Sequence, residues 1–133
     1  MTQVKEMTNP ELNRKLAELM GYTVYHYDKD VPERCYYMLV DPEGDYSGIE
    51  RPSEGMAWLD APWYVGDPAA SLEVEKAAIK ANYIKYVSTL CEILGGDPDE
   101  KSGDLSPEAV ADMLTASPRE RAEAAYQTLS GER

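Results

Sequence analysis

The sequence predicts an α+β protein: a small antiparallel sheet covered by helices, with one long central helix. Three observations lead to this class. A helical segment precedes a pair of strand-like segments, a long stretch of helical periodicity follows them, and two short helices end the chain. The length of 133 residues suits one domain. We expect residues 1–8 to form a flexible tail and residues 9–133 to form a single α+β domain.

The first helix is predicted to begin at Asn9, with either Asn9 or Thr8 as its cap, and Pro10 suits the first turn. Gly21 is predicted to end it, because glycine adopts the left-handed conformation that follows many helices. Its apolar face is predicted to consist of Leu12, Leu16, Leu19 and Met20.

Two strands are predicted to follow as an antiparallel hairpin. Residues 22–27 alternate aromatic and β-branched side chains, and residues 35–40 form a second, more apolar run. A turn over residues 28–32 separates them. Residues 45–61 are the least determined part of the chain, and within them Met56–Leu59 is a candidate third strand.

The long helix is predicted over residues 68–94. Asp67 is a favourable cap, Pro68 fits the first helical position, and Gly95-Gly96 supplies the stop. A narrow polar stripe runs along this segment, so we expect burial on more than one side. The polar stripe consists of Ser71, Glu75, Asn82, Lys85, Thr89 and Glu92. The side chains predicted to be buried are Ile79, Tyr83, Val87, Leu90 and Leu94.

An acidic loop over residues 97–104 is predicted to lead into two short helices. The first starts at Ser106-Pro107, and the second at Ser117-Pro118, where Glu120 completes a capping box. Residues 97–108 also have carboxylates at some EF-hand positions. Lys101 and Ser102 stand where that loop needs a ligand and a glycine, so no metal is expected.

Composition restricts the class of partner. The formal net charge of -12 argues against direct binding to nucleic acid or an anionic membrane, and it permits binding to a basic protein surface. Ten tyrosines and no phenylalanine indicate many rings with one solvated edge. Without a signal peptide or an apolar span, the expected location is the cytoplasm. Cys35 and Cys91 are expected to be reduced core residues, although the sequence leaves open a disulfide between them.

Three segments resemble a family of small bacteriophage proteins, the phage ABA sandwich domain. They are Glu18-Leu19-Met20-Gly21-Tyr22, the helix entry Tyr64–Val74, and the alanine-rich closing helix Ser117–Leu129. Leu72 stands where the family has tryptophan. The family carries no general catalytic assignment, so the resemblance implies a phage origin and a sandwich fold, and it implies no reaction.

No motif of a known catalytic class is present, and we do not expect an enzyme or a cofactor. His26, the single histidine, lies between two tyrosines and is interpreted as structural. The best candidate site combines aromatic rings with cations, as a nucleotide-like ligand requires. Its candidate ligand-binding residues are Trp58, Trp63, Tyr64, Arg51, Lys76 and Lys80.

Two functions of different classes follow. In the first, a non-enzymatic phage protein antagonises host defence by sequestering a small nucleotide-derived signal. In the second, an acidic protein covers a basic surface of a host protein, such as a nucleic-acid channel. The aromatic residues favour the first function and the net charge favours the second. The identity of the ligand and the oligomeric state remain open at this point.

Overall fold

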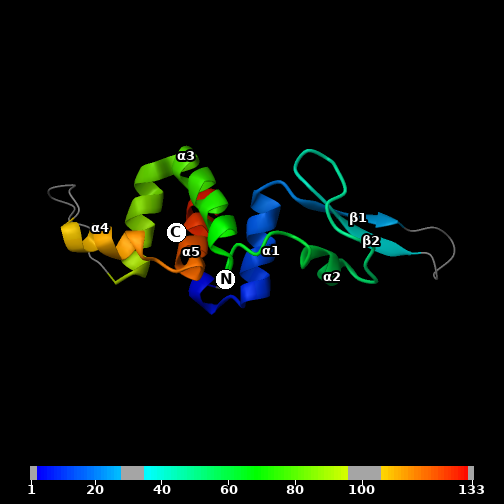
Figure 1. Cartoon of the computed structure of the whole chain (residues 1–133), viewed down its shortest axis with the longest axis horizontal. Coiled ribbons are helices and arrows are strands. Elements are labelled where there is room, and N and C mark those ends of the chain that lie inside the picture. The colour runs from blue at the N-terminus through cyan, green and yellow to red at the C-terminus, as the bar shows by residue number, and fades with distance from the viewer. Residues whose placement is uncertain (1–2, 28–34, 96–105, 132–133) are drawn as a thin grey trace.

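The computed structural model describes residues 3–27, 35–95 and 106–131. It confirms the α+β class, with a two-stranded antiparallel sheet and five α-helices in the described ranges. The molecule is elongated: the sheet and α2 lie at one end, α3, α4 and α5 at the other, and α1 between them (Figure 1). The elements are η1 (Val4–Glu6), α1 (Asn9–Leu19), β1 (Thr23–Tyr27), β2 (Tyr36–Val40), α2 (Glu54–Trp58), α3 (Pro68–Ile93), α4 (Pro107–Leu114) and α5 (Pro118–Ser130).

The prediction of a flexible tail over residues 1–8 is wrong for the described part of that segment. Val4 and Met7 are buried in the core, and residues 4–6 form a short 3-10 helix. The guanidinium of Arg119 on α5 donates hydrogen bonds to the carbonyls of Val4 (3.0 Å) and Met7 (2.8 Å). Two apolar side chains and one arginine therefore attach this segment to α5.

The predicted hairpin is confirmed. β1 pairs with β2 in antiparallel register, with Thr23 opposite Val40 and Tyr27 opposite Tyr36. The predicted turn over residues 28–32 lies outside the described residues. His26 stacks on Tyr37, its partner across the strands, with ring centroids 4.2 Å apart.

The prediction of a third strand at Met56–Leu59 is wrong, because residues 54–58 form α2. Ser53 caps this helix by accepting a hydrogen bond from the backbone N–H of Met56 at 3.3 Å. A cap of this kind favours a helix over the strand that the apolar composition indicates. The edge of β2 is instead paired by two isolated bridges, Val40 with Tyr46 and Tyr37 with Arg51.

The long helix is confirmed over Pro68–Ile93, but it bends at Asn82. Asn82 has non-helical torsion angles (φ -164°, ψ 86°), and its Oδ1 accepts a hydrogen bond from the backbone N–H of Lys85 at 3.1 Å. Asn82 thus acts as an N-cap for the second half of α3. The two halves diverge from a corner that points away from the rest of the molecule (Figure 1). Gly95 has a φ of +86°, in agreement with the predicted left-handed stop.

Burial along α3 differs from the prediction. Leu90 is buried and Val87 and Leu94 are half-buried, but Ile79 is 42% exposed and Tyr83 is 63% exposed. In the first half of α3 the residues that face the core are small, because α5 packs closely there and its buried residues include alanines. The buried residues of α3 are Ala70, Ser71, Val74, Ala78, Tyr86, Thr89, Leu90 and Cys91.

The predicted starts of the other helices agree with the structure. Thr8, Ser106 and Ser117 each accept a hydrogen bond from the backbone N–H three residues ahead, and the capping box at Ser117 is complete. Asp67 occupies the cap position of α3, but its side chain makes no capping hydrogen bond. Within the described ranges, no helix combines the length and apolar character that crossing a membrane requires.

Candidate protein-binding surface

Two of the three predicted stacking rings lie in the core. Tyr64 is 2% exposed, and burial raises the pKa of its phenol well above the usual value. Trp58 is 7% exposed, and the guanidinium carbon of Arg14 lies 5.0 Å from its ring centroid. Trp58 is the last residue of α2 and Tyr64 follows that helix, and both rings pack in the core. Neither ring is exposed for stacking, and their role in ligand binding stays a prediction.

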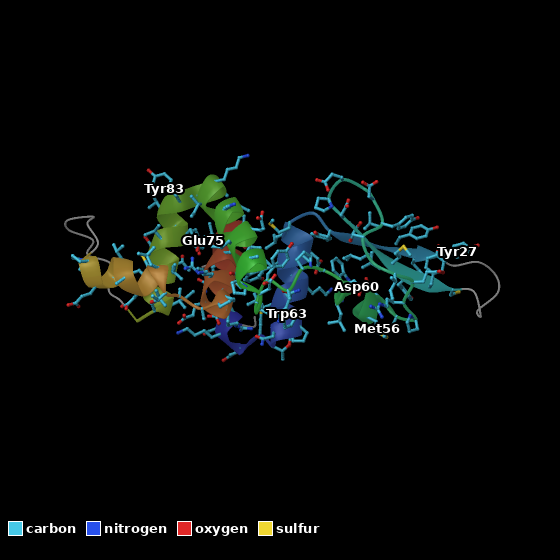
Figure 2. The ribbon with its side chains drawn as sticks, viewed as in Figure 1. Tyr27, Met56, Asp60, Trp63, Glu75 and Tyr83 are labelled. Atoms are coloured by element: carbon cyan, nitrogen blue, oxygen red, sulfur yellow. The ribbon has the colours of Figure 1, made fainter. Side chains whose placement is uncertain are left out.

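Trp63 is the partly exposed member of that group, at 39%. Its indole lies against Gly66, where an added Cβ would come within 2.3 Å of the ring nitrogen. The Trp63 carbonyl also accepts hydrogen bonds from the backbone N–H groups of Gly66 (3.2 Å) and Asp67 (2.8 Å). Trp63 therefore shapes the turn that leads into α3, near the centre of the molecule (Figure 2).

The three predicted cations do not converge on Trp63. Arg51 forms a bidentate pair with Asp60, at 2.9 Å and 2.6 Å, and hydrogen bonding to Arg51 holds the pKa of Asp60 below its usual range. Lys76 and Lys80 are exposed on α3, and an α-helix places them ~12 Å and ~18 Å along the axis from Pro68. The six predicted site residues thus do not form one pocket.

A different aromatic surface lies on the hairpin. The rings of Tyr27 and Tyr36 stack at 4.9 Å, those of Tyr36 and Tyr25 lie 6.3 Å apart, and Tyr25 meets Tyr46 edge-on at 5.9 Å. These four rings form a continuous row along one face of the sheet. Tyr25 is 42% exposed and Tyr46 is 60% exposed. We name this row, Tyr25, Tyr27, Tyr36 and Tyr46, the tyrosine face.

Strand geometry explains why the rings share a face. Side chains of a strand alternate between the two faces, and residues opposite each other on paired strands point the same way. Tyr25 and Tyr27 are two residues apart, and Tyr36 is opposite Tyr27. The other face carries Leu39, which is fully buried in the core with Trp58 of α2. Because α2 packs against that face, the tyrosine face is directed toward solvent.

Carboxylates lie beside part of the tyrosine face. Partial desolvation raises the pKa of the Tyr36 phenol, and the charge of Glu50 raises it further. The turn between Val40 and Tyr46 carries Glu43 and Asp45, and both of their backbone N–H groups donate to Asp41 Oδ1, at 3.0 Å and 2.9 Å. The turn therefore presents its acidic side chains on an ordered backbone.

The charge of the surrounding sequence is also negative. Residues 22–60 contain nine acidic and three basic residues, a net charge of -6, which is half of the chain's total of -12. In the described parts of that stretch, Arg51 is the single cation, and Asp60 binds it. The tyrosine face is thus an aromatic surface with an acidic rim. It fits a cationic partner better than a phosphate.

Sequence reasoning did not locate this surface, although two signals for it were present. The ten tyrosines indicated rings with a solvated edge, and the Tyr-x-Tyr spacing of Tyr25 and Tyr27 places two rings on one face of a strand. The missing information was the register that sets Tyr36 opposite Tyr27, together with the bridge that brings Tyr46 to Tyr25.

A second polar cluster, in the described residues of α3 and α5, holds helices together. Tyr86 donates a 2.6 Å hydrogen bond to Glu75 Oε2, and Arg121 pairs with the same carboxylate while donating to the carbonyls of Met113 and Leu114 at the end of α4. Within the described ranges, no group of three metal-ligating side chains is found. Most of the EF-hand-like segment lies outside these ranges. Cys35 and Cys91 are not joined by a disulfide.

No protein-family model, characterised protein or solved structure matches the chain. The resemblance to the phage ABA sandwich domain therefore stays a prediction.

Proposed function

We propose that this protein is a non-enzymatic binding protein that uses the tyrosine face and its acidic rim to cover a basic surface of a partner protein. One observation carries the proposal: four contiguous tyrosine rings, two of them widely exposed, lie beside carboxylates in a stretch, residues 22–60, whose net charge is -6. In the phage setting that the resemblance implies, the partner is a host protein.

Tyrosine is well suited to such a contact. Its ring contributes a large apolar area with little loss of side-chain entropy, and its hydroxyl forms hydrogen bonds at the rim. Arginine and lysine also bind the faces of aromatic rings. Carboxylates such as Glu50, Glu43 and Asp45 then attract cations and increase the association rate.

Sequestration of a nucleotide-derived signal is the weaker candidate, and it stays a prediction. Of the three rings predicted to stack on the ligand, Trp63 is partly exposed, whereas Trp58 and Tyr64 are buried. Its predicted cation Arg51 is held by Asp60. The tyrosine face offers rings for stacking, but the surrounding carboxylates repel phosphates.

The test uses a defined probe, an arginine-rich peptide of about 12 residues, titrated calorimetrically into the full chain. Tyr46→Ser leaves the net charge unchanged and removes the most exposed ring, so we expect the affinity to fall on the order of tenfold, as for an interface hot spot. Leu114→Ser is the matched control, because Leu114 is 74% exposed on the distant α4.

A second pair of variants separates a site from general charge attraction. Glu50→Gln and Glu92→Gln each remove one exposed carboxylate, the first beside the tyrosine face and the second near the end of α3. We expect only Glu50→Gln to weaken peptide binding. Equal losses from both, or wild-type affinity in Tyr46→Ser, would refute the proposed surface.

A further inference from the structure

The corner of α3 exposes an apolar group that the core does not use. Tyr83 is 63% exposed and Ile84 is 64% exposed, and Ile79 precedes them on the first half of the helix. The bend at Asn82 places these side chains at the apex, where Tyr83 projects outward (Figure 2). We name residues 76–85 the α3 corner.

The α3 corner is also the most cationic part of the described chain. It contains Lys76, Lys80 and Lys85 and no acidic residue, a local charge of +3 in a protein whose net charge is -12. Lys76 and Lys80 are exposed, and Lys85 is half-buried. The corner is thus a small apolar surface with a basic rim, and a complementary surface would be aromatic or apolar with an acidic rim.

The tyrosine face has that character. It combines the exposed rings of Tyr25 and Tyr46 with Glu50 and the acidic turn at residues 41–45. Within one molecule the two surfaces do not meet, because Tyr83 and Tyr27 lie at opposite ends (Figure 2). Any contact between them therefore joins two molecules.

We propose that the α3 corner of one molecule docks on the tyrosine face of a second copy of this chain, in a head-to-tail contact. The inference rests on the proposed binding role of the tyrosine face, and it names a second ligand for that face. Lysines of the corner would meet Glu50 and the acidic turn, while Tyr83 and Ile84 would pack on Tyr25 and Tyr46.

The geometry determines the kind of assembly. Each contact uses one corner and one face, so every added molecule leaves a free corner at one end and a free face at the other. Such a contact extends into short chains, and only an antiparallel pair that makes both contacts at once would close, as a two-fold dimer. Because the corner is small and the net charges repel, the contact is weak and depends on protein concentration.

The test is sedimentation velocity of the full chain from about 10 to about 500 μM, a range that reveals weak association by mass action. We expect the mean mass of the wild type to rise above that of the monomer as the concentration increases. Tyr83→Ser and Tyr46→Ser should each stay monomeric. An equimolar mixture of the two should form dimers and nothing larger, because each dimer joins the one intact corner to the one intact face.

Leu114→Ser is the control, and it should associate like the wild type. A wild type that stays monomeric throughout, or a mixture that fails to dimerise, overturns this inference. Either result leaves the proposed function intact, because the peptide titration is a separate measurement. If circular dichroism shows that Tyr83→Ser is unfolded, Lys80→Glu replaces it, with Lys15→Glu on α1 as a control of equal charge. Association by Lys80→Glu at the wild-type level also overturns the inference.

Discussion

Individual polar side chains hold the connecting segments of this protein in place. The side chain of Asn13 on α1 donates to the carbonyl of Pro62 at 2.9 Å and accepts from the backbone N–H of Val65 at 3.3 Å. Asp60 holds the segment at the edge of the sheet in place. Its carboxylate binds Arg51, and Gly48 packs against the Asp60 side chain. An added Cβ at Gly48 would come within 2.8 Å of Asp60 Oδ2, so only glycine fits there without displacement.

Asp60→Asn tests this attachment. The substitution weakens the pair with Arg51, and we expect the free energy of unfolding to fall by ~1 kcal/mol at pH 7, since hydrogen bonds to charged groups contribute more than neutral ones. The pKa of Asp60 is depressed in the folded state, so its contribution is complete above the unfolded value of about 4. It disappears as the pH falls through the folded value.

Urea denaturation at several pH values measures the effect. The gap between wild type and Asp60→Asn should be largest at neutral pH and should close in acid. Asp112→Asn, at an exposed site on α4, should stay within about 0.5 kcal/mol of the wild type. A difference in the free energy of unfolding that does not change with pH would mean that the charge of Asp60 does not contribute to stability.

At the level of helices, the close packing of α3 against α5 organises the larger core. Ala122, Ala124 and Ala125 of α5 are fully buried, and they belong to the same core as Ala78 of α3. Small side chains allow the two backbones to approach, and their bulkier neighbours Leu72 and Ile79 remain outside. The bond from Tyr86 to Glu75 links the second half of α3 to the first across the bend at Asn82.

Ala125→Leu is the corresponding prediction. A larger side chain at a fully buried position forces the helices apart, and overpacking of this kind costs about 1–3 kcal/mol. Ala111→Leu adds the same atoms at an exposed position of α4 and should change the free energy of unfolding by less than about 0.5 kcal/mol. Equal stability of the two variants would contradict close packing of α3 against α5 at Ala125.

In the whole molecule, the hairpin end and the α3 corner differ in local charge and in exposed apolar side chains. The hairpin end carries the tyrosine face and half of the net negative charge, whereas the α3 corner carries lysines. This polarity favours contacts at the two ends with partners of opposite charge. Repulsion among the carboxylates around the sheet also opposes folding.

Salt should therefore stabilise the protein. Raising NaCl from about 0.02 to about 0.5 M shortens the screening length from ~20 Å to ~4 Å, so repulsion within the acidic end decreases. We expect the melting temperature to rise by roughly 3–5 °C, equivalent to ~1 kcal/mol. A variant with Glu43→Gln and Glu50→Gln should gain less from salt, and an equal gain in both proteins would argue against local repulsion.

The sequence alone located α1, α3, α4, α5 and the hairpin, because caps, prolines and glycines act within one helical turn, but it did not locate α2. Thr8, Ser106, Ser117 and Gly95 each behaved as local rules predict, and the hairpin followed from alternation. Only the tertiary structure decided which face of α3 is buried, since that depends on the side chains that α5 offers. It likewise placed Trp58 and Tyr64 in the core and brought Tyr46 to Tyr25 through a bridge at the sheet edge. Burial and ring contacts arise between residues distant in sequence, and local patterns carry no information about that pairing.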